Sequence, residues 1–158
     1  MMTAFTTDDM RNALARVAEE AIFVCVDDPP AGAAWPNHLL MARVELRDPH
    51  DADVILVAIP DWCSQMAASF EGSDEPRVDS EVKRDDAFRE LLNMVCGILV
   101  GDESTPSGQP CFGIPNVDVI ARKTLDDLLS TSTRHVMLQA ESGEPIALLL
   151  VGKAAHAS

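Results

Sequence analysis

The sequence predicts an α+β domain in which two or three helices pack on a mainly antiparallel sheet. The chain has 158 residues, of which 47% are hydrophobic and 24% charged, a composition typical of globular domains. Strand patterns are mostly joined by short turns, which favours antiparallel pairing, and three segments have helical periodicity. We expect one domain over residues 1–158, with a frayed tail at 152–158.

The first half of the chain predicts a helix followed by a hairpin. Two threonines and two aspartates begin the helix, which runs from residue 6 to about residue 24 and stops before an Asp-Asp-Pro-Pro sequence. Residues 39–46 and 52–59 have strand patterns, and Asp-Pro-His-Asp between them forms a turn. The second strand is rich in Val and Ile, so we place it at the centre of the sheet.

Two helices are expected next. Pro60 begins a short helix that reaches about residue 70, and a polar loop follows it. Ser80 is suited to cap the longest helix of the chain, which extends to about Val100, and Gly101 supplies a left-handed stop.

The last third of the chain is expected to complete the sheet. Residues 112–121 have an extended pattern, with the strand itself expected around Val117, Val119 and Ile120, and residues 124–130 form one helical turn. The strands 135–140 and 146–151 flank a Glu-Ser-Gly-Glu turn and make a second hairpin.

Charge narrows the range of partners. Twelve basic and 26 acidic residues give a formal net charge of −14, which repels phosphate backbones and anionic membranes, so neither nucleic acid nor membrane is expected as a partner. The acidic N-terminal segment is unlike a signal peptide, and no apolar run is long enough to span a bilayer. We therefore predict a cytoplasmic protein.

The cysteines predict neither disulfides nor metal binding. They stand at positions 25, 63, 96 and 111, and no two of them have C-x-x-C spacing. Cys25, Cys63 and Cys96 lie in apolar runs, which favours buried thiols in a reducing compartment. No metal site is predicted.

The long helix carries the candidate site. Asp86, Glu90, Asn93 and Gly97 fall within an arc of roughly 60° at helical spacing. The opposite side of the same turns is apolar, so this stripe should face outward. In a helix interior Asn costs roughly 0.5 kcal/mol and Gly roughly 1 kcal/mol relative to Ala, so a plain solvent-facing surface would not favour them.

These residues resemble the signature of a known family. The sequence from Glu90 to Gly97, Glu-Leu-Leu-Asn-Met-Val-Cys-Gly, with Asp86 four residues before it, is similar to the E-L-x-N-M-x-x-G motif of the CheC/CheX/FliY chemotaxis phosphatases. The predicted order of elements is also similar over most of the chain. Members of the CheC type carry two signature helices and this chain has one, so the resemblance is to a CheX-like member.

The resemblance implies an enzyme that hydrolyses the phospho-aspartate of a CheY-type response regulator. Asn93 would orient the attacking water and Glu90 would pair with a lysine of the partner. Asp86 would act at the edge of that contact, and Gly97 would let the partner's backbone approach. The resemblance implies no cofactor of the protein's own, because the partner binds the Mg²⁺ ion.

Two other interpretations fit the same residues. In the first, the helix binds a receiver domain without hydrolysing its phosphate, and the protein is an adaptor or localisation module. Alternatively, the chain is a small dimerising domain whose stripe is ordinary surface; members of this branch are often dimers, so a homodimer is also expected from the resemblance.

Overall fold

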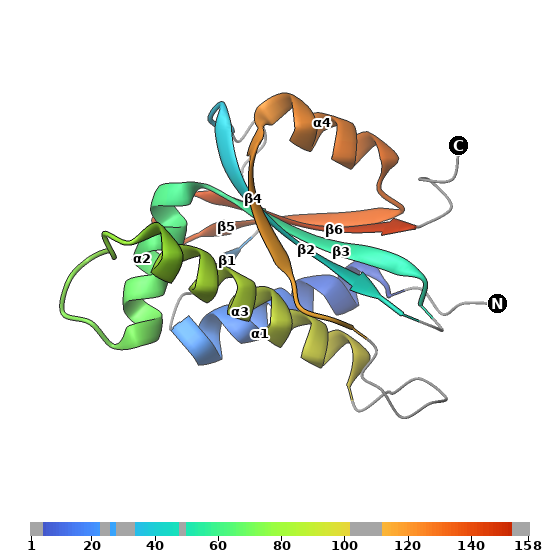
Figure 1. The fold of residues 1–158 in the computed structure, drawn as a ribbon. Coiled ribbons are helices and arrows are strands. Elements are labelled where there is room, and N and C mark those ends of the chain that lie inside the picture. Colours follow the sequence, from blue (N-terminus) through green and yellow to red (C-terminus); the bar gives the residue numbers. More distant parts are fainter. Residues whose placement is uncertain (1–4, 23–25, 28–33, 48–49, 102–111, 153–158) are drawn as a thin grey trace.

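The computed structural model describes residues 5–22, 26–27, 34–47, 50–101 and 112–152. Within these ranges the chain forms four helices and one six-stranded sheet (Figure 1). The helices are α1 (Thr7–Ile22), α2 (Pro60–Glu71), α3 (Glu81–Val100) and α4 (Arg122–Thr131). The strands are β1 (Val26–Asp27), β2 (His38–Leu46), β3 (Ala52–Ala58), β4 (Asn116–Ala121), β5 (Arg134–Ala140) and β6 (Pro145–Gly152).

The strands lie in the order β1-β5-β6-β3-β2-β4, and each neighbouring pair is antiparallel. Both predicted hairpins are confirmed: β2 pairs with β3, and β5 pairs with β6. The strand β3 is central, as predicted, and all seven of its residues are buried. A strand with apolar residues in every position is expected where helices cover both faces of a sheet.

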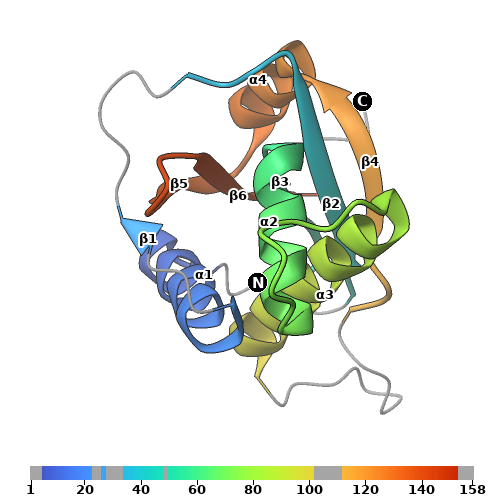
Figure 2. The same cartoon turned by 90° about the vertical axis from the view of Figure 1, so that its left-hand side faces the viewer.

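Helices cover the two faces of the sheet unequally. The helices α1, α2 and α3 pack on one face, and α4 lies alone on the other (Figures 1 and 2). Alternate residues of β3 divide between the two sides, with Val54 and Leu56 in the larger cluster and Ile55 and Val57 in the smaller. The predicted α+β architecture is therefore confirmed, with α3 held in the thicker helical layer.

The structure adds detail to the sequence prediction at three elements. The helical turn expected at 124–130 is a ten-residue helix, α4, because Leu125 has a buried site on the second face of the sheet. The strand expected around Val117, Val119 and Ile120 is confirmed as β4, which covers Asn116–Ala121 of the extended stretch, and Phe112 forms an isolated bridge with Leu46. The short strand β1 was not predicted; two residues are too few for a detectable pattern.

The strand β6 extends to Gly152, and the rest of the predicted tail lies outside the described residues. None of the helices in the described segments combines the length and the apolar composition needed to cross a membrane.

Candidate functional site

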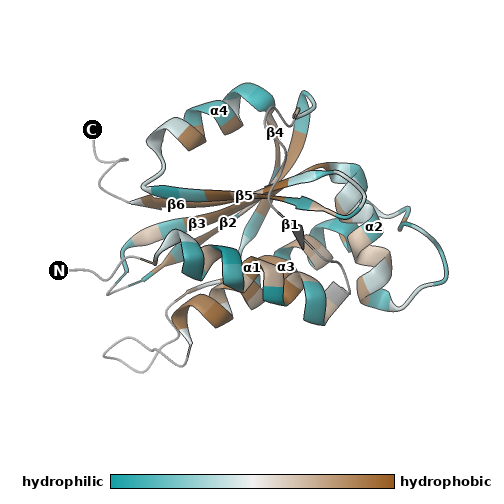
Figure 3. Ribbon diagram, turned by 180° about the vertical axis from the view of Figure 1, so that it is seen from behind, coloured by the Kyte–Doolittle hydropathy of each residue, from teal (hydrophilic) through white to brown (hydrophobic). Residues whose placement is uncertain are grey.

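The helix α3 is anchored along its inward side. Phe88, Leu91, Leu92 and Val95 have no solvent-exposed surface and belong to the larger apolar cluster. The helix packs against α2 and α1 and also contacts β2, β3 and β4. Figure 3 shows the resulting alternation of hydrophobic and hydrophilic residues on the helical layer. Because burial of this kind fixes a helix in the core, any side chain on the outward side is held on a rigid support.

The predicted stripe does face outward. Asp86 and Glu90 are exposed, and Asn93 and Gly97 are half-buried. The structure therefore brings all four residues onto one accessible side of α3, as the helical spacing predicted. Among the described residues, neither the Glu90 carboxylate nor the Asn93 carboxamide takes part in a hydrogen bond or ion pair. Both groups are thus available to another molecule.

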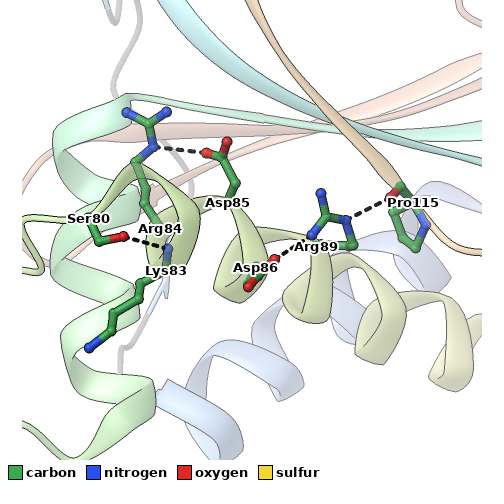
Figure 4. A network of polar contacts seen from close by, with 7 residues as sticks. All are labelled: Ser80, Lys83, Arg84, Asp85, Asp86, Arg89 and Pro115. Atoms are coloured by element: carbon green, nitrogen blue, oxygen red, sulfur yellow. Dashed lines mark hydrogen bonds and ion pairs between the residues drawn. The ribbon is translucent and has the colours of Figure 1, made fainter.

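Asp86 differs from the rest of the stripe because it already has a partner. Arg89 Nη1 lies 2.6 Å from Asp86 Oδ1, and Arg89 Nε donates a hydrogen bond to the carbonyl oxygen of Pro115 at 2.9 Å (Figure 4). The sequence places Asp86 and Arg89 three residues apart, a spacing at which helical side chains meet. The guanidinium neutralises Asp86 and also ties α3 to the segment that leads into β4.

The beginning of α3 is fixed by a cap and by contacts with α2. The Ser80 hydroxyl accepts a hydrogen bond from the backbone N–H of Lys83 at 3.2 Å, which confirms the predicted cap (Figure 4). The Lys83 ammonium lies 3.6 Å from the Glu71 carboxylate of α2. Both side chains are well exposed, so this ion pair contributes little to stability.

The end of α3 departs slightly from the prediction. Gly101 has the expected positive φ of 60°, but its ψ of −133° lies outside the left-handed helical region. Gly97, inside the helix, has open space where a side chain would begin: no heavy atom outside its immediate surroundings lies within 4 Å of an ideal Cβ. The fold itself therefore does not require glycine at position 97.

The two thiols that the structure describes give no nucleophile at this site. Cys63 and Cys96 are free and buried, as predicted, whereas Cys25 and Cys111 lie outside the described residues. Burial raises the pKa of the Cys96 thiol to about 12. Burial also raises the pKa of Cys63, and Arg84 offsets only part of that effect. Both thiols are therefore protonated near neutral pH and lack the thiolate needed for nucleophilic catalysis.

The sequence prediction did not include two features that lie beside the stripe. Val82, one turn before Asp86, continues the stripe with a valine that is 69% exposed; its helical spacing from Asp86 is a signal that pattern analysis could have used. A hollow of about 270 Å³ also opens between α2 and α3, and Glu90 and Asp86 form part of its lining. No sequence pattern predicts which residues of α2 lie beside α3.

A hollow elsewhere in the molecule is separate from the stripe. It measures about 370 Å³ and is lined by residues of β2, β3 and the segment before β4. Arg43 Nε donates a hydrogen bond to Asp53 Oδ2 there at 2.8 Å, and Asp53 is almost fully buried. Arg43 and Asp53 thus satisfy each other, and Glu45 and Arg47, which also line this hollow, have interactions within the protein as well.

The fold and the stripe together define a class: an antiparallel α+β domain with an acidic and amide-bearing helix on its thicker layer. No protein-family model matches the sequence, and no curated protein matches it either. Solved structures do match. The chemotaxis protein CheX of Desulfovibrio desulfuricans is 11% identical with a TM-score of 0.57, over 90% of this chain and 96% of that one.

Two further structures match as well. CheX of Vibrio vulnificus is 10% identical with a TM-score of 0.60, over 92% of this chain and 95% of that chain. The complex of CheX with CheY, BeF₃ and magnesium from Borrelia burgdorferi contains a chain that is 12% identical, with a TM-score of 0.59 over 91% of this chain and 95% of that one. The resemblance stated from the signature residues is thus confirmed for the fold, which is CheX-like over most of the chain.

Proposed function

We propose that this protein is a phosphatase that hydrolyses the phospho-aspartate of a CheY-type receiver domain. In the reaction, water attacks phosphorus, the bond between phosphorus and the aspartyl oxygen breaks, and the products are inorganic phosphate and a free aspartate carboxylate. The Mg²⁺ ion bound by the receiver neutralises charge on the transferring group. The task left to this chain is to hold the water in line with the bond that breaks.

Asn93 is the residue we assign to that task. A carboxamide both donates and accepts hydrogen bonds, so it can fix the orientation of a water molecule, and it does not titrate. Its contribution is positional: a water held at the attacking distance avoids the entropy cost of finding that position. Asn93 would act without taking a proton, because an amide is not a general base.

Glu90, Asp86 and Gly97 are assigned to docking. Glu90 is exposed, without an ionic partner among the described residues, and one turn from Asn93. It is therefore suited to pair with a cation of the receiver. That local attraction would offset the repulsion between this chain, with its net charge of −14, and the negatively charged phosphorylated site of the receiver. Asp86, already bound to Arg89, lies at the edge of this contact. Gly97 leaves room for the receiver's backbone.

One observation carries the proposal: a carboxylate and a carboxamide, neither engaged by described residues, stand side by side on the rigid outward face of a helix in a CheX-like fold. The Borrelia burgdorferi structure adds support, because its CheX is bound to CheY together with BeF₃ and magnesium. The fold alone does not specify an activity, so the chemistry of Glu90 and Asn93 is the argument for hydrolysis.

The test is release of phosphate from phosphorylated receiver domains of the host, with and without this protein. We expect Asn93→Ala to lower the rate by about a hundredfold, by analogy with loss of one positioned donor to a transition state, while binding to the receiver is kept. The control is Asn12→Ala, which removes an exposed asparagine from α1. Full activity in Asn93→Ala would show that the proposed mechanism is wrong.

Glu90→Ala separates docking from hydrolysis. It should raise the receiver concentration needed for half-maximal rate and leave the maximal rate nearly unchanged. A wild-type protein that binds the receiver but releases no phosphate would instead be the receiver-binding module considered above.

A further inference from the structure

The hollow between α2 and α3 has an apolar floor beside the stripe. Ala67 and Phe70 of α2 and Ala87 of α3 line it, and Phe70 and Ala87 are partly buried residues packed against the main core. The two alanines are short, so their small side chains leave the space that Phe70 borders. Its volume of about 270 Å³ lies below the range of roughly 300–1,000 Å³ typical of small-molecule pockets, so it is better suited to a side chain of a protein partner than to a free cofactor.

The charged groups around this floor are largely satisfied within the protein. Glu71 and Lys83 lie 3.6 Å apart across the hollow, from one helix to the other. Asp86 is held by Arg89 at 2.6 Å. The hollow is therefore an apolar floor bordered by charged side chains, and Glu90 is the one acid of that border that has no ionic partner among the described residues.

We propose that this hollow receives one aliphatic side chain of the receiver domain, next to the cation that faces Glu90. This inference rests on the proposed function and extends it, because it adds α2 to the docking surface and makes Phe70 and Ala87 residues that determine specificity. The hollow is continuous with the stripe, since Asp86 and Glu90 belong to both.

The overall charge of the chain supports an apolar occupant. An acidic protein with a net charge of −14 gains little from long-range attraction, unless the partner presents a basic surface. Burial of an aliphatic side chain contributes to binding without regard to charge sign. Aromatic residues such as Phe70 are enriched in the cores of protein interfaces, where they offer apolar surface to a partner. One aliphatic contact beside one ion pair would therefore supply affinity from the first and orientation from the second.

The experiment tests the hollow by substituting a larger side chain at one of the residues that line it. Ala87→Leu places a larger, helix-compatible side chain on the floor, and Ala15→Leu, at a half-buried position of α1 outside the hollow, is the matched control. Binding of the beryllofluoride-loaded receiver is measured by titration, and phosphate release is measured on the phosphorylated receiver. We expect Ala87→Leu to weaken binding by tenfold or more and to keep the rate at saturating receiver.

A salt series identifies the occupant. The loss caused by Ala87→Leu should be the same at low and high salt, whereas the loss caused by Glu90→Gln should shrink as salt screens the ion pair. A loss in Ala87→Leu that disappears at high salt would mean that the hollow takes the cation, and would overturn the proposal. If circular dichroism shows that Ala87→Leu is misfolded, Ala87→Met replaces it.

Failure of this inference can be told from failure of the proposed function. A wild-type protein that releases phosphate, together with an Ala87→Leu variant that binds as tightly as wild type, overturns the docking hollow alone. A wild-type protein that binds but does not hydrolyse overturns the phosphatase, while the binding titration still tests the hollow. A wild-type protein that neither binds nor hydrolyses any receiver of the host overturns both.

Discussion

The two sides of α3 are made of opposite kinds of residue. On the inward side Phe88, Leu91 and Leu92 are completely buried in the main core. On the outward side Glu90 and Asn93 make no polar contact with described residues, although they are direct neighbours of buried leucines in the sequence. Together with the proposed function, this contrast predicts that stability depends on one face of the helix and activity on the other. Substitutions on each side should therefore change one property and leave the other.

Leu92 and Asn93 give the largest expected contrast. Leu92→Ala removes a fully buried side chain and leaves a cavity, so we expect it to lower the free energy of unfolding by about 2–5 kcal/mol. Asn93→Ala should change it by less than about 0.5 kcal/mol, because the residue lies on the outward side. Urea unfolding measures both values.

The activities of these variants should rank in the opposite order. Phosphate release per folded molecule should be near that of wild type in Leu92→Ala and strongly reduced in Asn93→Ala. If Asn93→Ala proved as destabilising as Leu92→Ala, Asn93 would belong to the structural side of the helix, and the separation of the two faces would be wrong.

On the buried side of α3, Cys96 should make the free energy of unfolding decrease at alkaline pH. Burial raises the pKa of Cys96 to about 12, whereas a thiol in the unfolded chain titrates near pH ~8.5. Above that pH only the unfolded state loses the proton, so this stabilising contribution is complete below pH ~8.5 and declines as pH rises toward 12. The slope is about 1.4 kcal/mol per pH unit, or about 2 kcal/mol between pH 8.5 and 10.

Cys96→Ala tests this slope. The difference in free energy of unfolding between wild type and Cys96→Ala should diminish by that amount over the same pH interval. Cys63 contributes a slope of the same sign to both proteins, because burial raises its pKa too. Parallel pH curves for the two proteins would mean that Cys96 is accessible to solvent in the folded state.

The sequence predicted the elements whose patterns are long. The twenty residues of α3, with Ser80 as cap and a complete apolar face, specify both the helix and the outward direction of Asp86, Glu90 and Asn93. The two hairpins follow in the same way from strand patterns joined by short turns. Local periodicity is sufficient for these features because it fixes which side of an element is apolar.

The parts that the sequence did not predict depend on contacts between distant segments. The helix α4 is mostly polar. It is longer than predicted because Leu125, Leu128 and Leu129 pack on the second face of the sheet. The bond from Arg89 to the carbonyl of Pro115 joins residues 26 apart in sequence. The hollow beside Glu90 likewise depends on how α2 packs against α3. All three features depend on tertiary packing, and local sequence patterns do not indicate which distant segments pack together.

Gly97 gives a small expected effect on stability and a sharp test of the comparison between the two sides of α3. No neighbouring group would obstruct a side chain there, and the position is helical. Gly97→Ala should therefore raise the free energy of unfolding by about 0.5–1 kcal/mol, because alanine loses less conformational entropy on folding. If the receiver's backbone approaches this position, the added methyl group should also weaken docking, by about tenfold for a clash of ~1–2 kcal/mol.

Gly101→Ala is the control, because its φ of 60° is unfavourable for alanine and the substitution should destabilise the fold. Thermal unfolding and receiver titration of both variants separate the two roles of glycine. A more stable Gly97→Ala protein with weaker docking means that this glycine is retained for a partner at the expense of helix stability. A more stable Gly97→Ala protein with unchanged docking would remove Gly97 from the docking surface, and the functional stripe would end at Asn93.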